Sequence, residues 1–429
     1  MNITGAWPAV FMAILFAAGC ASSKDHPTVP RPHEELERQV MVMLSTPGPI
    51  RLGPWDEAGP SYQSGRGLTQ ISSTARAVAR QYHLELLDDW PMPSLRVHCV
   101  VAQLSSGQDL DEVLAHLNVD PRVVWAQPMQ RFHTVAQAQP AEREVAGARW
   151  RHLEVLHNIA TGRRVTIAQI DTGVDLNHPD LAGQFTEARD FVTGNGFVPE
   201  LHGTAVAGVI VARPDSSIGL VGIAPGARVM LLRACWETGE VDAAACNSFS
   251  LAKALQYAMR RDVQLINLSL TGPRDILLGR LIDRATAQGI AIIAAADDGG
   301  TSSGFPANHP GVIAVGSRAS PRGQRTLLAP GQDVLTTTPN ATWGFQSGAS
   351  FSAAHVTGLS ALLLEVSPDL TPKRIEEVLR RTGTNPGGIS AEALVDPCAA
   401  LTALRGQGES VRCSPLAEAV DRSNPAGLR

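Results

Sequence analysis

The sequence lacks an excess of basic residues, and charged residues of either sign are few. Its 429 residues include 36 Lys and Arg against 41 Asp and Glu, which gives a formal net charge of −5 at pH 7. Nucleic-acid binding is therefore disfavoured, because no basic surface is available to neutralise phosphates. Only 18% of the residues are charged, whereas 44% are hydrophobic. This composition excludes a disordered or fibrous chain, and the length suffices for two or three globular domains.

Metal-ligand motifs are also missing. The sequence contains no H-E-x-x-H motif and no Cys/His spacing typical of a zinc site. A metal-dependent hydrolase therefore has no support, and we expect that the chemistry requires no metal or other cofactor.

The first twenty residues form an apolar stretch that is too short to span a membrane comfortably, although no Lys or Arg precedes it. This pattern predicts an export signal over residues 1–19. The sequence A-A-G-C that ends at Cys20 resembles a bacterial lipobox, which implies a lipid anchor on Cys20 and a place in the cell envelope. The alternative is an ordinary secretory signal that happens to contain a cysteine.

Six cysteines are present, and export makes disulfides permissible. With Cys20 assigned to lipid and Cys99 to an N-terminal domain, four remain. Neighbour pairing is the simplest of three connectivities, and the alternative is that some are buried free thiols. The expected pairs are Cys235 with Cys246 and Cys398 with Cys413.

Hydrophobic patterns divide the chain into two folded domains. The first shows the order strand, helix, strand, strand, helix, strand of a ferredoxin-like α+β domain. The second alternates apolar strands with helices, which predicts an α/β fold with a parallel sheet covered on both faces. The expected segments are a signal (1–19), a tether (20–38), the first domain (39–134), a linker (135–149), the second domain (150–405) and a tail (406–429).

Three reactive side chains fall where a parallel sheet collects its ligands. Asp171 ends an apolar strand, His202 opens a helix of small residues, and Ser350 lies at the N-terminus of an apolar helix. Together they can perform nucleophilic acyl transfer, in which the hydroxyl attacks, the imidazole accepts its proton and the carboxylate orients the imidazole. The segment G-A-S-F-S around Ser350 does not supply the G-x-S-x-G turn of α/β-hydrolases.

The order Asp, His, Ser and the motifs D-T-G-V-D, H-G-T-x-V-A-G and G-x-S-x-x-A-x-H-V-x-G occur together. On these motifs the second domain resembles a subtilisin-like serine peptidase of the subtilase family. The resemblance implies a seven-stranded-type parallel sheet and hydrolysis of protein or peptide substrates through an acyl-enzyme. The first domain resembles the inhibitor-like propeptide of the family, which implies that it binds the second domain as an intramolecular inhibitor and chaperone.

The same resemblance assigns further roles. It makes Gly304 the base of the S1 pocket, with room for a large apolar side chain. It also suggests a structural Ca²⁺ near Asp180 and the loop 214–225, where Ser216 would be a weak ligand. The substrate-binding strand would be formed by Ser269, Leu270 and Thr271.

The segment AIIAAADDGG departs from the family pattern. Where the family has an Asn that donates to the oxyanion, an ungapped count places Asp298, and a one-residue shift would place Asp297. An ionised Asp cannot donate, whereas a protonated Asp can, so the oxyanion hole would consist of Asp298 and the Ser350 N–H. The alternative function is a weak or inactive pseudopeptidase that binds peptides in the envelope. A purely structural envelope lipoprotein would leave the intact triad unexplained.

The order of the segments also has a consequence for location. Cys20 lies before the linker, so cleavage between residues 135 and 147 would separate the second domain from its lipid. The protein is therefore expected as a lipid-anchored envelope protein, or as a protease released to the periplasm or extracellular space after processing.

Overall fold

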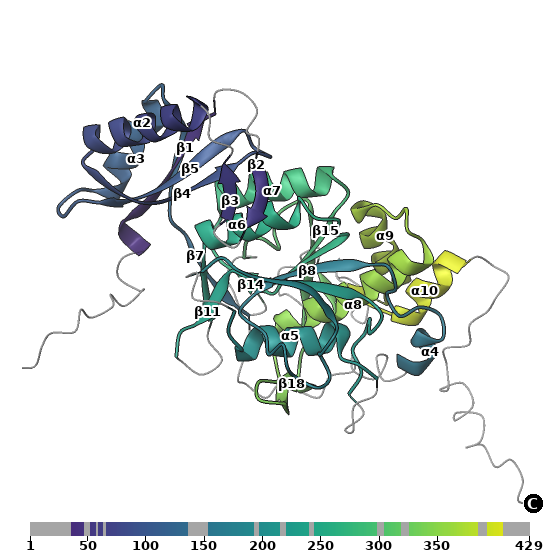
Figure 1. Ribbon diagram of the computed structural model, residues 1–429. Helices are drawn as coiled ribbons and strands as arrows, with labels where there is room; N and C mark the ends of the chain where they lie inside the picture. Colours follow the sequence, from purple (N-terminus) through teal and green to yellow (C-terminus); the bar gives the residue numbers. More distant parts are fainter. Residues whose placement is uncertain are drawn as a thin grey trace, which may run out of the picture.

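A computed structural model describes the chain in eleven segments, which form two domains (Figure 1). Cys20 and Cys413, together with the signal, the tether and the tail, lie outside the described residues, as do Ser216 and Asp298. The described segments are 36–46, 52–56, 59–62, 66–135, 153–192, 197–214, 220–239, 244–297, 304–318, 326–384 and 393–405.

The N-terminal domain is a four-stranded antiparallel sheet in the order β4-β5-β1-β6, with two helices on one face. This is the expected ferredoxin-like arrangement. The hairpin of β2 and β3 was not predicted from the sequence. The elements are η1 (Leu36–Arg38), β1 (Gln39–Ser45), β2 (Leu52–Asp56), β3 (Gly59–Tyr62), α2 (Arg66–Gln81), β4 (Leu84–Met92), β5 (Val97–Leu104), α3 (Leu110–Val119) and β6 (Val123–Pro128).

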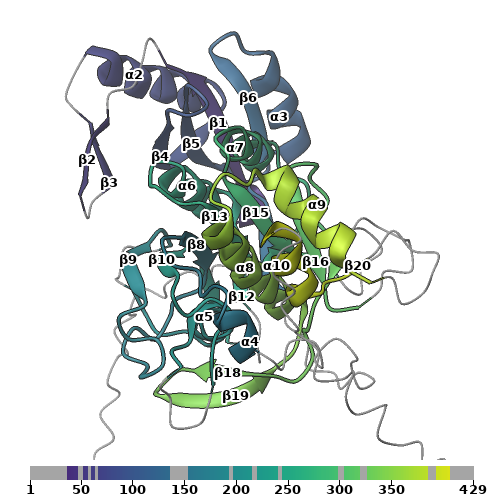
Figure 2. The same ribbon diagram turned by 90° about the vertical axis from the view of Figure 1, so that its right-hand side faces the viewer.

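Strand β1 shows why both faces of this sheet are buried. Val40 and Val42 belong to the cluster formed with the domain's own helices. Met41 and Met43 belong to an apolar cluster shared with α6 (Ser248–Ala258) and α7 (Ile276–Ala287) of the second domain. Successive side chains of a strand point to opposite faces, so one strand serves both contacts. Figure 2 shows the N-terminal sheet lying over α6 and α7.

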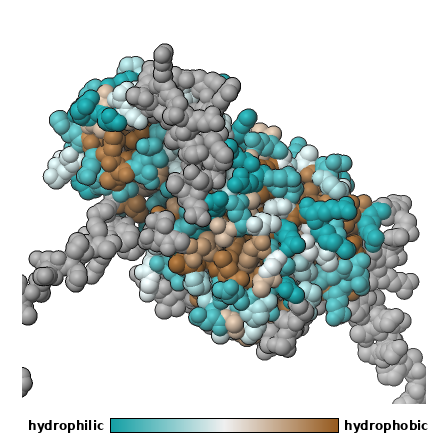
Figure 3. Space-filling view, in the orientation of Figure 1, coloured by the Kyte–Doolittle hydropathy of each residue, from teal (hydrophilic) through white to brown (hydrophobic). Residues whose placement is uncertain are grey.

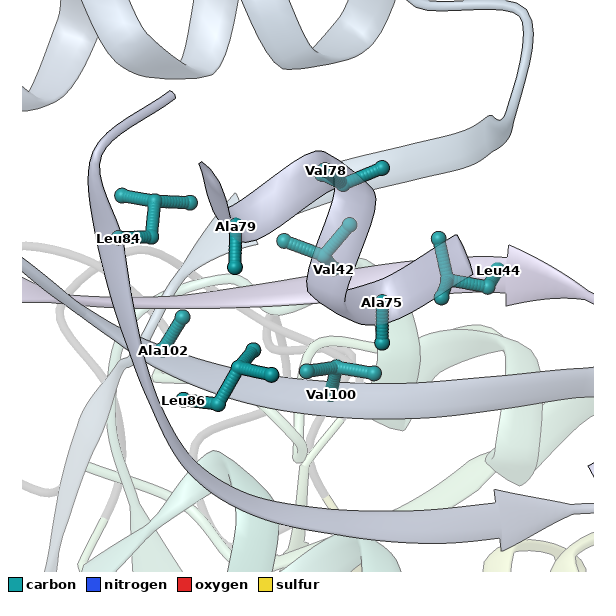
Figure 4. Close-up of a pocket in the computed structure, with 9 residues that line it drawn as sticks. All are labelled: Val42, Leu44, Ala75, Val78, Ala79, Leu84, Leu86, Val100 and Ala102. Atoms are coloured by element: carbon teal, nitrogen blue, oxygen red, sulfur yellow. The ribbon is translucent and has the colours of Figure 1, made fainter. Parts of the chain in front are cut away.

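A small apolar pocket lies between α2 and the N-terminal sheet (Figure 4). Its walls belong to the core of the N-terminal domain, and all of its lining side chains are aliphatic. It offers no polar group for chemistry. The lining residues are Val42, Leu44, Ala75, Val78, Ala79, Leu84, Leu86, Val100 and Ala102.

The second domain is built on an eight-stranded parallel sheet, in the order β20-β17-β16-β15-β13-β8-β10-β9. Among the described residues, the sheet therefore has one strand more than the seven expected from the sequence. The strands are β8 (Thr166–Asp171), β9 (Phe185–Asp190), β10 (Arg228–Arg233), β13 (Leu265–Leu268), β15 (Ala291–Ala295), β16 (Val312–Gly316), β17 (Leu327–Leu328) and β20 (Ala393–Leu394).

Helices cover both faces of this sheet. Strand β15 alternates between two apolar clusters: Ile293 contributes to the cluster that includes α5 and α8, and Ile292 to the cluster that includes α6 and α7. The described helices are α4 (Leu153–His157), α5 (Leu201–Val211), α6 (Ser248–Ala258), α7 (Ile276–Ala287), α8 (Ala349–Val366), α9 (Pro372–Thr382) and α10 (Pro397–Arg405).

Helix α8 is apolar on nearly all sides, as expected for a helix at the centre of a large domain. It is the one described helix long and apolar enough to cross a membrane, but 89% of that stretch is buried inside the protein. It is therefore a core helix. Figure 3 shows a mainly hydrophilic or mixed surface, with apolar areas on both domains.

Six further strands of the second domain's region lie outside the large sheet. Strands β7 (Arg131–Thr134), β11 (Cys235–Glu237), β12 (Ala244–Asn247) and β14 (Leu270–Thr271) form a separate sheet in the order β11-β12-β7-β14. Strands β18 (Val334–Thr338) and β19 (Thr342–Gln346) form a hairpin below α5, as Figure 1 shows. Strand β7 belongs to the N-terminal part of the chain and is nevertheless paired within the second domain.

Candidate active site

Asp171 is the last residue of β8, at the carboxyl edge of the large sheet. Its side chain is only 2% exposed, and its Oδ1 accepts a hydrogen bond from the backbone N–H of Thr172 at 2.6 Å. The same oxygen lies 2.7 Å from His202 Nδ1. Because an ionised carboxylate only accepts, this contact fixes the proton of a neutral imidazole on Nδ1.

His202 is the second residue of α5, and small residues bring this helix close to the strand that ends at Asp171. The backbone N–H of Gly203 donates to Thr172 Oγ1 at 2.8 Å, and a Cβ at Gly203 would overlap the carbonyl oxygens of Thr172 and Gly173. With Nδ1 bonded to Asp171, His202 Nε2 is buried and has no partner among the described residues. It is therefore available as a proton acceptor.

Ser350 is the second residue of α8, whose N-cap is Gly348 at φ 140°. The His202 ring lies 5.9 Å, centroid to centroid, from the ring of Phe351, the residue after the serine. Ser350 Oγ donates to the Ser269 carbonyl oxygen at 3.0 Å, so its proton is directed away from His202 in this structure. The structure thus brings the three predicted residues to one edge of the sheet.

The N-terminal part of the chain occupies this site. Ser350 Oγ accepts a hydrogen bond from the Val135 backbone N–H at 3.2 Å, and the Ser350 backbone N–H donates to the Val135 carbonyl oxygen at 3.4 Å. The carbonyl group of Val135 therefore lies beside the Ser350 hydroxyl and against the positive end of α8.

Strand β7 leads into this position between two strands of the second domain. It pairs antiparallel with β12, where Phe132 is opposite Cys246, and with β14, where Thr134 is opposite Leu270. Main-chain pairing on both sides is the way in which an extended peptide adds to sheet edges. The predicted substrate strand, Ser269 to Thr271, thus contacts a peptide segment, but β12 on the other side was not predicted.

Phe132 fills a pocket next to the sheet formed by β12, β7 and β14. Its side chain is fully buried, and its ring lies 6.3 Å from that of Phe305. Gly272 forms the wall, because a Cβ at that position would overlap the ring of Phe132. No local pattern indicates this pocket, since Gly272 and Phe305 meet only through a long-range bridge.

The side chain of Thr271 packs against the α-carbon of Gly304. A Cβ at Gly304 would overlap Thr271 Oγ1 and would lie 3.7 Å from the Cβ of Asp297. The assignment of Gly304 to the S1 pocket stays a prediction.

Asp298 lies outside the described residues, and Asp297 is the last described residue after β15. The Ser350 backbone N–H is the donor that the structure places at the Val135 carbonyl oxygen.

The carboxylate of Asp180 is buried and hydrogen-bonded within the protein. Asp180 is 3% exposed, and its Oδ2 accepts a hydrogen bond from the indole N–H of Trp343 at 2.6 Å. One oxygen of this carboxylate is therefore bonded to Trp343, and the calcium site stays a prediction, because residues 215–219 of the expected loop lie outside the described residues. Within the described segments, no group of three or more His, Cys, Asp or Glu could hold a metal ion.

A buried ion pair at the start of α5 was also not predicted. Glu200 is the N-cap of α5, and its carboxylate binds the guanidinium of Arg233 at 2.8 and 3.0 Å. It also accepts a hydrogen bond from the Gly173 backbone N–H at 2.5 Å. This pair links the turn after Asp171 to the start of the helix that contains His202.

One of the two expected disulfides is present among the described residues. Cys235 and Cys246 are bonded across β11 and β12, with their Cα atoms 4.2 Å apart. The bond fixes the strand that pairs with β7. The partner expected for Cys398 is Cys413, which lies outside the described residues, so that pairing stays a prediction.

The fold and the arrangement at the end of β8 belong to one class of proteins, the subtilisin-like serine endopeptidases. The model of the subtilase family matches residues 162–400, more than half of the chain, and the chain belongs to this family. It is a serine-type endopeptidase, and members of the family need no cofactor for catalysis.

Individual relatives agree with this assignment. Subtilisin E of Bacillus subtilis (strain 168) is 31% identical over 304 residues, which cover 65% of this chain and 75% of the relative. The thermophilic serine proteinase of Bacillus sp. (strain AK1) is 32% identical over 322 residues, covering 71% and 78%.

A solved structure supports the fold. Fervidolysin from Fervidobacterium pennivorans, described as a keratinolytic enzyme related to subtilisin, matches with a TM-score of 0.64 and 22% identity. The match covers 89% of this chain, which spans 62% of the fervidolysin chain. At this identity the likeness concerns the fold alone.

Proposed function

We propose that the protein is an endopeptidase in which Ser350 is the nucleophile, His202 the general base and Asp171 the residue that orients the imidazole. We further propose that the segment ending at Val135 is its first substrate. The observation behind this is the Val135 carbonyl group, which lies within hydrogen-bonding distance of the Ser350 backbone N–H.

The reaction begins when the Ser350 hydroxyl rotates from the Ser269 carbonyl towards His202 Nε2. Rotation between staggered side-chain positions is fast compared with enzymatic turnover. The Ser350 oxygen then attacks the carbonyl carbon of Val135 while its proton passes to Nε2. The resulting imidazolium is stabilised by Asp171, whose Oδ1 lies 2.7 Å from Nδ1.

The tetrahedral intermediate is stabilised by the Ser350 backbone N–H at the start of α8. Its collapse breaks the bond between Val135 and Ala136, and the imidazolium gives its proton to the departing amine. Water, activated by the same imidazole, then hydrolyses the acyl-enzyme and frees the serine.

Asp298 is proposed as the side chain facing the oxyanion. In its ionised form it opposes the developing negative charge, and in its protonated form it donates as an Asn would. In subtilisin, loss of the Asn donor at this position lowers turnover by about 10²–10³. We therefore expect Asp298→Asn to raise turnover at neutral pH, measured with a chromogenic peptide. Unchanged or lower turnover would contradict the role of Asp298.

The proposed nucleophile is tested with a fluorophosphonate probe, which labels an activated serine covalently. We expect labelling of the processed wild-type enzyme and none of Ser350→Ala. Absence of labelling in the wild type at every pH from about 5 to about 10, a range that includes the ordinary titration of histidine, would instead favour the pseudopeptidase that only binds peptides.

The N-terminal domain is proposed to act as an intramolecular inhibitor before it is cleaved off. Gln127 of β6 supports this, because it donates to Asp275 Oδ2 at 2.9 Å and accepts from the Leu277 backbone N–H at 3.0 Å. The N-terminal domain thereby completes the N-cap of α7, while β7 blocks the site.

Cleavage after Val135 would also release the enzyme from the lipid proposed on Cys20. We expect the processed wild type in the soluble fraction and Ser350→Ala in the membrane fraction. Identical fractionation of the two forms would contradict this release.

A further inference from the structure

A chain of three buried hydrogen bonds joins Thr357, in the middle of α8, to the backbone of Ser350. The Thr357 hydroxyl donates to Asn267 Oδ1 at 2.8 Å, and Asn267 Nδ2 donates to Ser269 Oγ at 2.9 Å. Ser269 Oγ in turn donates to the Ser350 carbonyl oxygen at 3.0 Å. All four residues are at most 1% exposed, so these bonds lie in the core of the domain.

The periods of the helix and of the strand explain how these residues meet. Thr357 follows Ser350 by seven residues, so both lie on one face of α8. Asn267 belongs to β13 and Ser269 follows it by two residues, so their side chains point to the same side of the extended chain. That side is turned towards α8, because both side chains form hydrogen bonds with residues of this helix.

The donors in this chain are all directed towards Ser350. Thr357 donates to the oxygen of the Asn267 amide, so the NH₂ group of this amide is turned to Ser269. A hydroxyl has only one proton to donate. Ser269 Oγ therefore accepts from Asn267 and gives its own proton to the Ser350 carbonyl oxygen.

Removal of the Thr357 hydroxyl would leave Asn267 Oδ1 without this donor in the core, which is costly. If the amide of Asn267 then turned over, its oxygen would face the Ser269 hydroxyl. The Ser269 proton would pass to that oxygen, and the Ser350 carbonyl would lose its contact with Ser269.

This contact bears on the chemistry because Ser269 holds Ser350 at two points. Its hydroxyl binds the Ser350 carbonyl oxygen, and its own carbonyl oxygen accepts from Ser350 Oγ at 3.0 Å. The backbone fixed in this way includes the Ser350 N–H, which donates to the Val135 carbonyl oxygen. A displacement of about 1 Å among reacting groups lowers the rate by about 10².

We propose that Thr357 is a positioning residue for the nucleophile, and that it holds the Ser350 backbone in place through Asn267 and Ser269. This inference rests on the proposed function, in which Ser350 attacks the substrate. Thr357 does not contact the substrate itself, because it lies about 10 Å further along the axis of α8.

The test compares the processed wild type with Thr357→Val and Thr357→Ala, which both remove the donor. We expect kcat for a quenched fluorescent peptide to fall about tenfold or more, while KM changes less than about twofold, because the strands that pair with a peptide are unchanged. The rate of fluorophosphonate labelling should fall by a similar factor, since labelling requires the same positioned serine.

Two controls separate positioning from a general effect on the helix. Thr357→Ser keeps the donor and should retain kcat within about threefold of the wild type. Ser360→Ala removes another buried hydroxyl of α8, which donates to the Val356 carbonyl oxygen at 2.7 Å and not to this chain. It should leave kcat within about twofold of the wild type.

A double-mutant cycle tests whether Thr357 acts through Ser269. Ser269→Ala removes the hydroxyl that contacts the Ser350 carbonyl oxygen. In that background Thr357→Val should lower kcat by less than about twofold, because the group through which it acts is already absent.

The outcomes separate this inference from the function on which it rests. Wild-type kcat in Thr357→Val and Thr357→Ala would overturn the inference and leave the endopeptidase intact. So would an equal loss in Thr357→Ser, or an undiminished effect of Thr357→Val in the Ser269→Ala background. If Thr357→Val does not fold, Thr357→Ala and Thr357→Ser decide the question. A wild type that cleaves no peptide and is not labelled by fluorophosphonate would overturn the proposed function and the inference together.

Discussion

Glu200 and Arg233 form a buried ion pair at the start of the helix that contains His202. Arg233 Nε lies 2.8 Å from Glu200 Oε2, and both side chains are at most 9% exposed. Removing one partner of such a pair leaves a charge buried without full compensation, which is strongly destabilising. Asp190 remains near the guanidinium, at 3.2 Å, but it is a single and longer contact.

Glu200→Gln should therefore lower the free energy of unfolding by about 3 kcal/mol, measured by urea denaturation in the Ser350→Ala background to prevent autolysis. The control is Glu377→Gln, which removes an exposed ion pair with Arg374 and should change stability by less than about 1 kcal/mol. Equal effects of the two substitutions would contradict the structural role of Glu200.

Stability should depend on pH through His355, one turn after Ser350 in α8. Burial lowers the pKa of His355 from 6.5 to about 4, against the opposing effect of the Phe351 carbonyl at 2.8 Å. Between these values the unfolded chain binds a proton that the native protein does not bind. The free energy of unfolding is therefore unaffected by His355 above about pH 6.5. It decreases as the pH falls from 6.5 towards 4, because only the unfolded chain is protonated there.

This pKa shift corresponds to a loss of about 3 kcal/mol in the free energy of unfolding between pH 6.5 and 4. We expect His355→Gln, again in the Ser350→Ala background, to show a flatter decline of unfolding free energy between pH 6.5 and 4 than the protein with His355. Parallel curves for the two proteins would exclude His355 as the titrating group.

We expect the indole N–H of Trp343 to satisfy the Asp180 carboxylate, so that no bound cation is needed there. If its indole N–H satisfies the carboxylate, addition of calcium or of a chelator should leave the melting temperature unchanged. Trp343→Phe removes the N–H and leaves Asp180 Oδ2 buried without that donor, which should cost about 1–3 kcal/mol. A wild-type protein that melts at a lower temperature in chelator would disprove this view.

The close contact between Gly272 and the ring of Phe132 predicts a preference for a phenylalanine at this position of a bound peptide. The pentapeptide RFHTV, which corresponds to Arg131 to Val135, should inhibit the processed enzyme competitively through Phe132. Gly272→Ala introduces a Cβ that overlaps the phenyl ring, so inhibition should weaken by about tenfold or more. The matched peptide RAHTV should inhibit both enzymes equally, and an unaltered inhibition constant for RFHTV in Gly272→Ala would refute the assignment.

The elements that could be predicted from the sequence are those with strong local patterns. The apolar strands of the large sheet are recognisable from their own residues, and Asp171 and Ser350 follow directly from a strand end and a helix start. The disulfide between Cys235 and Cys246 was also predicted, because its partners lie only 11 residues apart.

Contacts between distant segments were missed, because no local pattern encodes them. Strand β7 is only four residues long, and its partner Ala245 lies far along the chain from His133. Trp343 and Asp180 are separated by 163 residues. The contact of the Thr271 hydroxyl with Gly304 was missed for the same reason.

The bond between Val135 and Ala136 provides the most direct test of the account. Full-length wild type and Ser350→Ala are expressed in parallel, and intact masses and new N-termini are determined. We predict that the wild type yields a fragment that begins at Ala136, whereas Ser350→Ala stays uncleaved. A wild-type chain that stays intact, or a Ser350→Ala chain cut at the same bond, would contradict the claim that Ser350 attacks the carbonyl it contacts.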